Sequence, residues 1–179
     1  MRIITGKYKG RAIKMPKGIR PSQNKVRKAL FDILGDIKGF SFLELFAGSG
    51  AIGIEALSRG ARDLTLVENE RNCLLAIKNN IESLKLQNYT IYPTEALQAV
   101  EALHKKRKEF DIIFFDPPYY EGLSKKTLQM LAAYDILAPN GFIAAQHFKK
   151  DNLPDAVGDL ILFKQSYYGD TVLSFYRKL

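Results

Sequence analysis

Residues 44–53 read Glu44-Leu45-Phe46-Ala47-Gly48-Ser49-Gly50-Ala51-Ile52-Gly53 and join an apolar run to a helical pattern. The glycines form a G-x-G-x-x-G motif, which permits a tight turn and brings a ligand close to the backbone and the helix amino terminus. Glu68 ends the next apolar run, about 20 residues after Gly48, where a carboxylate can accept both ribose hydroxyls of an adenosine cofactor. The alternative role of Glu68 is a surface acid that caps the following helix. The stretch predicts an adenosine cofactor and leaves open a nicotinamide dinucleotide or S-adenosylmethionine.

The chain around this motif alternates apolar runs of strand length with helical patterns. The expected strands cover residues 42–46, 63–68, 89–92, 110–115 and 141–147. The expected helices cover residues 51–59, 70–84, 94–104 and 124–134. Strict alternation of this kind is typical of βαβ crossovers. We therefore expect an α/β fold of the Rossmann-like type, with a mostly parallel twisted sheet and helices on both faces.

Three further features lie outside this alternation. A helix is expected after Ser22, a fair N-cap, because apolar residues follow at helical spacing at Val26, Leu30, Ile33 and Ile37. Residues 139–141, Pro-Asn-Gly, predict a turn immediately before the fifth strand. Beyond that strand, residues 160–167 and 171–176 flank a Gly-Asp pair and predict a C-terminal antiparallel hairpin.

Length and composition limit the kind of protein. With 179 residues, 46% of them hydrophobic, we expect a single globular domain over residues 1–179 with a basic N-terminal extension at 1–20. The one cysteine, Cys73, cannot form an internal disulfide, and the start of the chain has no apolar run of signal-peptide length. No run approaches the roughly 18 apolar residues that a bilayer span needs. We therefore expect a cytoplasmic protein without a membrane segment.

Positive charge is concentrated at the start of the chain. The 27 basic and 19 acidic residues give a net charge of +8, and ten of the basic residues fall within residues 1–28, which contain no acid. The remainder therefore has 17 basic residues against 19 acidic ones. Such an extension attracts a polyanion through counterion release, and nucleic acid is the commonest such partner. The alternative is a solvated basic face that only aids solubility.

A second motif, Asp116-Pro117-Pro118-Tyr119, ends the fourth expected strand. The carboxyl ends of strands in an open parallel sheet flank the crevice that binds ligands, so both motifs are expected at one site. Two prolines remove two backbone donors and leave a rigid turn that presents carbonyl oxygens and one carboxylate. These acceptors suit the N–H donors of the exocyclic amine of a base, and the base itself can stack on the ring of Tyr119. The alternative is a plain loop terminator with Tyr119 in the core.

Together the motifs resemble those of amino-group methyltransferases that use S-adenosylmethionine. The wider chain resembles the RsmD family, the 16S ribosomal RNA guanine-N2 methyltransferases. This resemblance covers nearly the whole length, and it is carried by residues 1–4, 6–11, 20–22, 26–31, 45–50, 55–61, 116–119 and 168–171. It implies a class I methyltransferase fold and S-adenosylmethionine as the cofactor.

The resemblance also assigns roles to individual residues. To catalysis it assigns Asp116, Pro117, Pro118 and Tyr119. To cofactor binding it assigns Glu44, Phe46, Ala47, Gly48, Ser49, Gly50, Glu68, Asn69, Glu95, Ala96 and Asp116. With the charge pattern, it predicts RNA contacts at Lys7, Lys9, Arg11, Arg20 and Arg27. Glu95 has an equal alternative role as a first-turn helix acid beside a Thr94 cap.

Four positions depart from the family pattern. Glu44 stands where aspartate is more usual, and Ser22 stands where threonine is more usual, so carboxylate and hydroxyl chemistry are kept. Asn24-Lys25 replaces an acid and an arginine, which bears on the details of the RNA face.

The resemblance implies an enzyme that methylates the N2 amine of a guanine in 16S ribosomal RNA or the assembling small subunit. We expect it to be a monomer. No metal is expected, since the two histidines, His104 and His147, lack metal-ligand spacing. A DNA adenine-N6 methyltransferase shares both motifs, but it usually needs a target-recognition region, and only 60 residues follow Tyr119. Two rivals from different classes are a non-catalytic RNA-binding protein on the same fold and a nicotinamide oxidoreductase.

Overall fold

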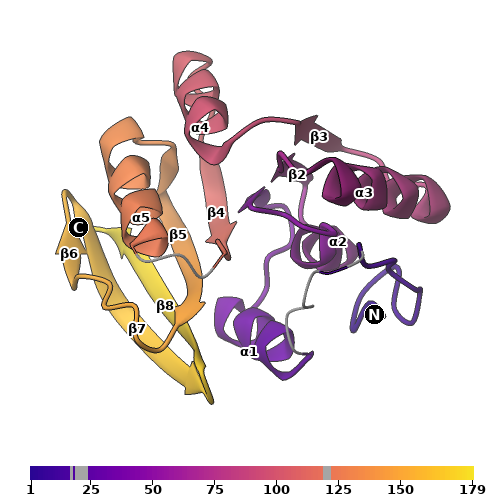
Figure 1. The fold of residues 1–179 in the computed structure, drawn as a ribbon, viewed down its shortest axis with the longest axis horizontal. Helices are drawn as coiled ribbons and strands as arrows, with labels where there is room; N and C mark the ends of the chain where they lie inside the picture. Colours follow the sequence, from indigo (N-terminus) through magenta and orange to yellow (C-terminus); the bar gives the residue numbers. More distant parts are fainter. Residues whose placement is uncertain (17, 19–23, 119–121) are drawn as a thin grey trace.

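The computed structural model describes residues 1–16, 18, 24–118 and 122–179. Within this part of the chain, eight strands form one sheet in the order β3-β2-β1-β4-β5-β8-β7-β6 (Figure 1). Their bounds are β1 (Ser41–Leu45), β2 (Asp63–Val67), β3 (Tyr89–Tyr92), β4 (Phe110–Phe115), β5 (Leu137–Phe148), β6 (Ala156–Val157), β7 (Leu160–Tyr168) and β8 (Thr171–Lys178). Strands β1 to β5 pair in parallel, and β6, β7 and β8 join antiparallel. The predicted parallel sheet with a C-terminal hairpin is confirmed.

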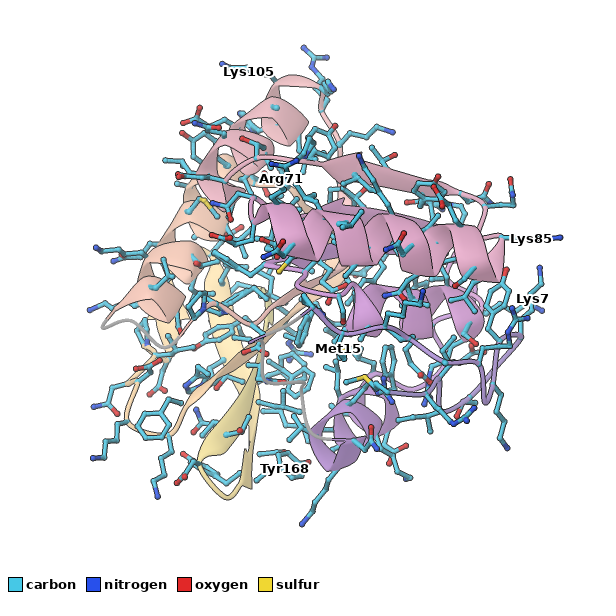
Figure 2. All side chains as sticks on the ribbon, turned by 45° about the vertical axis from the view of Figure 1, so that its right-hand side comes forward. Lys7, Met15, Arg71, Lys85, Lys105 and Tyr168 are labelled. Carbon is cyan, nitrogen blue, oxygen red and sulfur yellow. The ribbon has the colours of Figure 1, made fainter. Side chains whose placement is uncertain are left out.

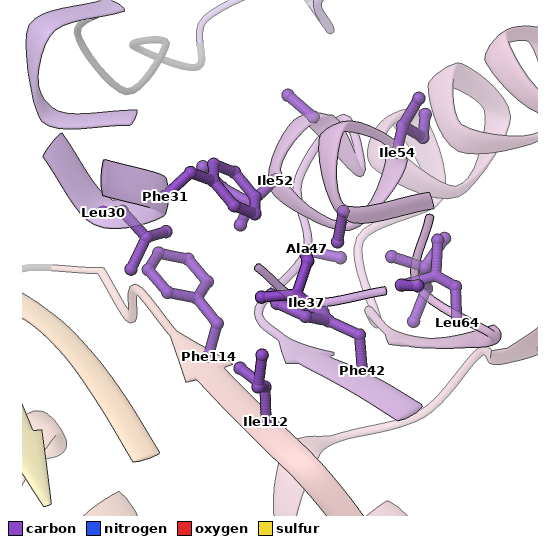
Figure 3. Packing of buried hydrophobic residues seen from close by; sticks show 14 of the residues in the cluster. Leu30, Phe31, Ile37, Phe42, Ala47, Ile52, Ile54, Leu64, Ile112 and Phe114 are labelled. Atoms are coloured by element: carbon purple, nitrogen blue, oxygen red, sulfur yellow. The ribbon is translucent and has the colours of Figure 1, made fainter. Parts of the chain in front are cut away.

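Helices cover both faces of the sheet, as the alternation predicts. Their bounds are α1 (Asn24–Leu34), α2 (Ala51–Ser58), α3 (Arg71–Leu84), α4 (Ala96–Lys105) and α5 (Leu123–Tyr134). Phe42 of β1 belongs to a core cluster with residues of α1, α2 and α3, whereas its neighbour Leu43 belongs to a cluster with residues of α4 and α5. Figure 3 shows the first cluster, with Leu30 and Phe31 of α1 beside Phe114 of β4. Successive side chains of a strand point to opposite faces of the sheet. Because helices cover both faces, every residue of β1 is buried.

Strand β5 corrects the expected turn at residues 139–141. The strand runs from Leu137 to Phe148, and its register against β4 shifts between the pairs Phe110↔Leu137 and Ile112↔Phe142. The Pro-Asn-Gly segment therefore forms a bulge inside the strand rather than a turn before it. A bulge suits these residues because proline donates no ladder hydrogen bond. A Cβ on Gly141 would lie 2.9 Å from the carbonyl oxygen of Asp111.

Smaller differences concern the ends of elements. Helix α4 begins at Ala96 with Glu95 as its N-cap, so Thr94 is not the cap. Strand β6, with two residues, was not predicted. The expected Ser22 cap of α1 lies outside the described residues. No helix in the described ranges is long and apolar enough to cross a membrane.

The first part of the basic extension packs against helix α2. An antiparallel bridge joins Arg2 and Ala12, and both Ile3 and Ile13 enter the core. The Glu55 carboxylate on α2 accepts hydrogen bonds from the backbone N–H groups of Ile4 and Thr5 at 2.7 and 3.0 Å. Residues 1–13 are therefore anchored to α2 by two charge-assisted hydrogen bonds and by the burial of the two isoleucines.

Candidate active site

The loop between β1 and α2 places the glycine motif at the carboxyl edge of the sheet. Gly48 and Gly50 have φ values of 57° and 73°, in the left-handed region that glycine adopts without strain. A Cβ on Gly53 would lie 2.4 Å from Leu64 Cδ1 and 2.8 Å from Glu44 Oε2. The first two glycines therefore shape the loop, and the third lets α2 pack closely on the strands.

The Glu68 carboxylate ties the end of β2 to this loop. Its Oε2 accepts a hydrogen bond from the Gly48 N–H at 2.7 Å, and its Oε1 accepts from the N–H groups of Asn69 and Glu70 at 2.8 and 2.9 Å. A carboxylate offers about four lone-pair sites, so about one remains for a ligand. A ligand that donates two hydroxyls to Glu68 must therefore displace one backbone donor.

A cavity of about 360 Å³ opens beside Glu68. The predicted residues in its wall are Phe46, Glu68, Asn69, Glu95 and Ala96. The remaining wall residues, which were not predicted as site residues, are Val67, Thr94, Leu97, Leu123, Lys126, Thr127 and Met130. Among the described residues, the predicted Ala47, Gly48, Ser49 and Gly50 form the adjacent loop rather than the cavity wall. The cavity thus lies between the end of β2 and helices α4 and α5.

Glu44 lies beneath the loop, not in the cavity. Its side chain is 3% exposed, and its Oε2 accepts a hydrogen bond from the Gly53 N–H at 2.8 Å. Burial raises the pKa of Glu44 to about 8, and the negative charges of Asp116 and Glu68 act in the same direction. The Glu44 carboxyl therefore holds its proton through most of the neutral range and supports the first turn of α2 as a structural acceptor.

Asp116 directly follows β4 and lies beside β5. Phe115 pairs with Ala145, so Asp116 is level with Gln146, whose Nε2 donates a hydrogen bond to Asp116 Oδ2 at 2.7 Å. Sequence reasoning missed Gln146, although a buried glutamine within an apolar strand is itself a signal. Pro117 is buried and Pro118 is exposed.

Tyr119 lies outside the described residues, so its stacking role stays a prediction. His147 is buried, and its Nε2 lies 2.8 Å from Ser174 Oγ. Burial lowers the pKa of His147, as expected for a structural histidine. No cluster of three or more potential metal ligands occurs in the part of the chain that the structure describes.

The predicted RNA contacts divide into three groups. Lys7, Lys9 and Arg11 are exposed on the packed N-terminal segment, and Arg20 lies outside the described residues. The prediction for Arg27 is wrong, because this residue is 0% exposed and donates hydrogen bonds to the Arg2 carbonyl and to Asn24 Oδ1. Its guanidinium holds the start of the chain against α1 and is not exposed on the surface.

Comparison with known proteins supports the resemblance found in the sequence. The family described as conserved hypothetical protein 95 matches residues 1–177. A Buchnera aphidicola protein named ribosomal RNA small subunit methyltransferase D is 40% identical over 84% of this chain and 80% of its own. The Escherichia coli K12 protein of that name is 32% identical over 99% of this chain and 90% of its own. The chain belongs to the RsmD family.

Solved structures agree with the predicted fold. The putative methyltransferase yhhF from Escherichia coli is 32% identical and superimposes with a TM-score of 0.89, covering 99% of this chain and 97% of its own. SMU.776, a putative methyltransferase complexed with SAH, shares the fold with a TM-score of 0.66 at 20% identity, covering 89% of this chain and 50% of its own. The predicted class I methyltransferase fold is confirmed.

Proposed function

We propose that this chain transfers a methyl group from S-adenosylmethionine to the exocyclic N2 amine of a guanine in 16S ribosomal RNA. The names of the RsmD relatives support an rRNA substrate and the reaction class. One observation carries the proposal. Glu68, which lines the cavity, directly follows β2, and Asp116 directly follows β4. Strands β2 and β4 are the two neighbours of β1 in the sheet. A cofactor-sized cavity and an amine acceptor therefore share one edge of the sheet.

The cavity beside Glu68 suits S-adenosylmethionine in size and chemistry. About 360 Å³ lies within the usual range of small-molecule sites, roughly 300 to 1,000 Å³. Phe46, Leu97 and Met130 provide apolar walls for a purine, and the carboxylates of Glu68 and Glu95 provide acceptors for hydroxyl and amine groups. We expect Glu68 to hold the ribose and Glu95 to face the adenine amine. When bound, S-adenosylmethionine supplies an electrophilic methyl group on a sulfonium.

The protein's task at the target is to aim a poor nucleophile. The lone pair of the guanine amine is delocalised into the ring. Hydrogen bonds from the amine to the Asp116 carboxylate and the Pro117 carbonyl would draw it toward tetrahedral geometry and direct the lone pair at the methyl group. Because these acceptors sit on a proline-rigid turn, they cost little reorganisation during the in-line displacement. Asp116 or water then takes the proton.

Transfer of labelled methyl to small-subunit particles and to naked 16S RNA, both from a strain lacking the enzyme, tests the proposal. We expect N2-methylguanosine in the digested RNA and no label in a DNA duplex. Asp116→Ala should lower the transfer rate roughly a hundredfold or more, because one preorganised acceptor is lost, while cofactor affinity stays within a few fold. Asp159→Ala, at an exposed turn, is the control and should leave the rate unchanged. Label in DNA alone, or near-normal turnover by Asp116→Ala, would contradict the proposal.

A further inference from the structure

The side-chain amide of Gln146 is a group that holds Asp116 from the neighbouring strand. Its Nε2 donates to Asp116 Oδ2 at 2.7 Å, the short distance of a charge-assisted bond. The orientation is chemically consistent, since an amide presents N–H donors to an ionised carboxylate and would present its oxygen only to a protonated one. Gln146 thus acts on the residue that the proposed function places at the target amine.

Gln146 is itself rigidly placed. Within β5, its neighbours Ala145 and His147 pair with strands on the two sides, Ala145 with Phe115 of β4 and His147 with Val172 of β8. Its side chain is 4% exposed. A donor on a doubly paired central strand, buried by its surroundings, has few alternative rotamers or partners. The amide therefore offers Asp116 a fixed donor rather than a mobile surface contact.

The charges around Asp116 explain why a neutral donor suits this position. Glu44 at the end of β1 interacts electrostatically with both Asp116 and Glu68, so three carboxyl groups gather at this edge of the sheet. Glu68 has three backbone donors, and Glu44 is held by the Gly53 N–H and is buried. A neutral amide at Gln146 orients Asp116 without cancelling its negative charge, whereas a lysine or arginine would form an ion pair that competes with the incoming amine.

We propose that Gln146 is a positioning residue for methyl transfer, whose amide fixes the Asp116 carboxylate in the orientation that accepts the target amine. This inference rests on the proposed function of Asp116. It extends the candidate site to β5, a strand that carries none of the motif residues.

Two substitutions test the role. Gln146→Leu removes the donor at similar length, and Gln146→Met removes it while keeping the unbranched shape of the side chain. Both should lower the single-turnover rate of methyl transfer roughly tenfold or more, with S-adenosylmethionine affinity within about threefold by calorimetry. The acid limb of the rate–pH profile should move to higher pH by about one unit, because the ionised Asp116 loses a hydrogen bond while the negative charge of Glu68 remains.

Gln165→Leu is the matched control. The side-chain amide of this exposed glutamine on β7 donates a hydrogen bond to Ser174 Oγ at 2.8 Å. Two strands, β5 and β8, separate β7 from β4. The same substitution there should leave the rate and the pH profile unchanged. In an Asp116→Ala background, Gln146→Leu should cause no further loss of rate, because its effect runs through the missing carboxylate.

The outcomes separate this inference from the proposed function. If Asp116→Ala keeps its activity, the proposed function fails whatever Gln146 does. If Asp116→Ala is inactive but both Gln146 variants keep the wild-type rate and pH profile, the positioning role is overturned. It is overturned equally if rate, cofactor affinity and melting temperature fall together without a shift of the acid limb, since that pattern marks a structural residue.

Discussion

The Glu68 carboxylate holds the glycine loop through the Gly48 N–H and faces the cavity at the same time. Replacing Glu68 with alanine therefore removes a loop contact and a cofactor acceptor together. We expect Glu68→Ala to weaken S-adenosylmethionine binding by about 1 to 3 kcal/mol, the cost of leaving hydrogen-bonding groups unpaired. Titration calorimetry measures this difference directly.

Glu70→Ala is the control for that experiment. Glu70 is exposed, precedes α3 and makes no side-chain cap bond, so it changes the local charge equally without touching the loop. Unchanged affinity in both variants would rule out the ribose assignment for Glu68. Equal weakening in both would point to general electrostatics instead of a hydrogen bond.

Glu44 makes stability depend on pH. Burial raises the pKa of Glu44 to about 8, above an unfolded value of about 4.3, so folding takes up a proton. The stabilisation is complete below about pH 4 and is lost as the pH rises to about 8, by up to about 1.4 kcal/mol per unit. Glu44→Gln keeps an acceptor for the Gly53 N–H but does not titrate. Urea unfolding from pH 5.5 to 8.5 should therefore show that the free energy of unfolding of the wild type falls with rising pH relative to that of the variant. A constant difference between the two proteins would contradict the raised pKa of Glu44.

Arg27 shows where a count of charges stops being informative. Its place in a basic segment predicted an RNA contact, yet it precedes the buried Leu30 and Phe31 by three and four residues and so lies on the apolar face of α1. Helical spacing carried that information, and charge did not. The glycine loop and Glu68 were predictable because chain order alone fixes their spacing.

At the scale of elements, alternation of apolar runs predicted the parallel strands and their helices, because a strand buried on both faces has little freedom in composition. The bulge in β5 was not predicted, since residues 139–141 carry turn chemistry and only the pairing with β4 shows that the strand continues past them. Strand β6 has two residues, which is too short to leave a pattern. Its existence depends on the neighbouring β7.

Helix α5 shows why the cavity wall was harder to predict than the loop. Leu123, Thr127 and Met130 recur at helical spacing, which predicts one face of a helix but not whether that face meets the core or a cavity. Gln146 likewise meets Asp116 only through the register of β4 and β5. Contacts between elements distant in the chain decide both features, and a single sequence does not contain them.

At the scale of the whole molecule, the uneven charge predicts where RNA docks. Residues 1–28 hold ten basic residues and no acid. The exposed Lys7, Lys9 and Arg11 belong to this segment, which packs on α2 through Glu55. In Figure 2, Lys7 lies near Lys85 at the end of α3, far from Lys105 at the end of α4. A rigidly held basic surface contacts phosphates with less loss of conformational entropy than a free tail does.

Neutralising Lys7, Lys9 and Arg11 together with glutamine should therefore flatten the salt dependence of RNA binding. Each phosphate contact contributes roughly 0.7 to 0.9 to the slope of log affinity against log salt, so the triple variant should lose about 2 units of slope. Cofactor affinity should not change, because the backbone donors that hold Glu68 and the residues that line the cavity all come from residues 46–130. RNA affinity measured over a range of salt concentrations, with calorimetry for the cofactor, checks both statements.

The matched control neutralises Lys105, Arg107 and Lys108, three exposed residues at the end of α4, and so changes the net charge by the same amount elsewhere on the surface. If the N-terminal segment docks the RNA, its variant loses slope while the control stays parallel to the wild type, because screened charges act over only about 10 Å in 0.1 M salt. Equal loss in both would show that net charge alone attracts the RNA. Lines parallel to the wild type in the N-terminal variant would place the docking surface elsewhere and leave Lys7, Lys9 and Arg11 as a solvated basic face.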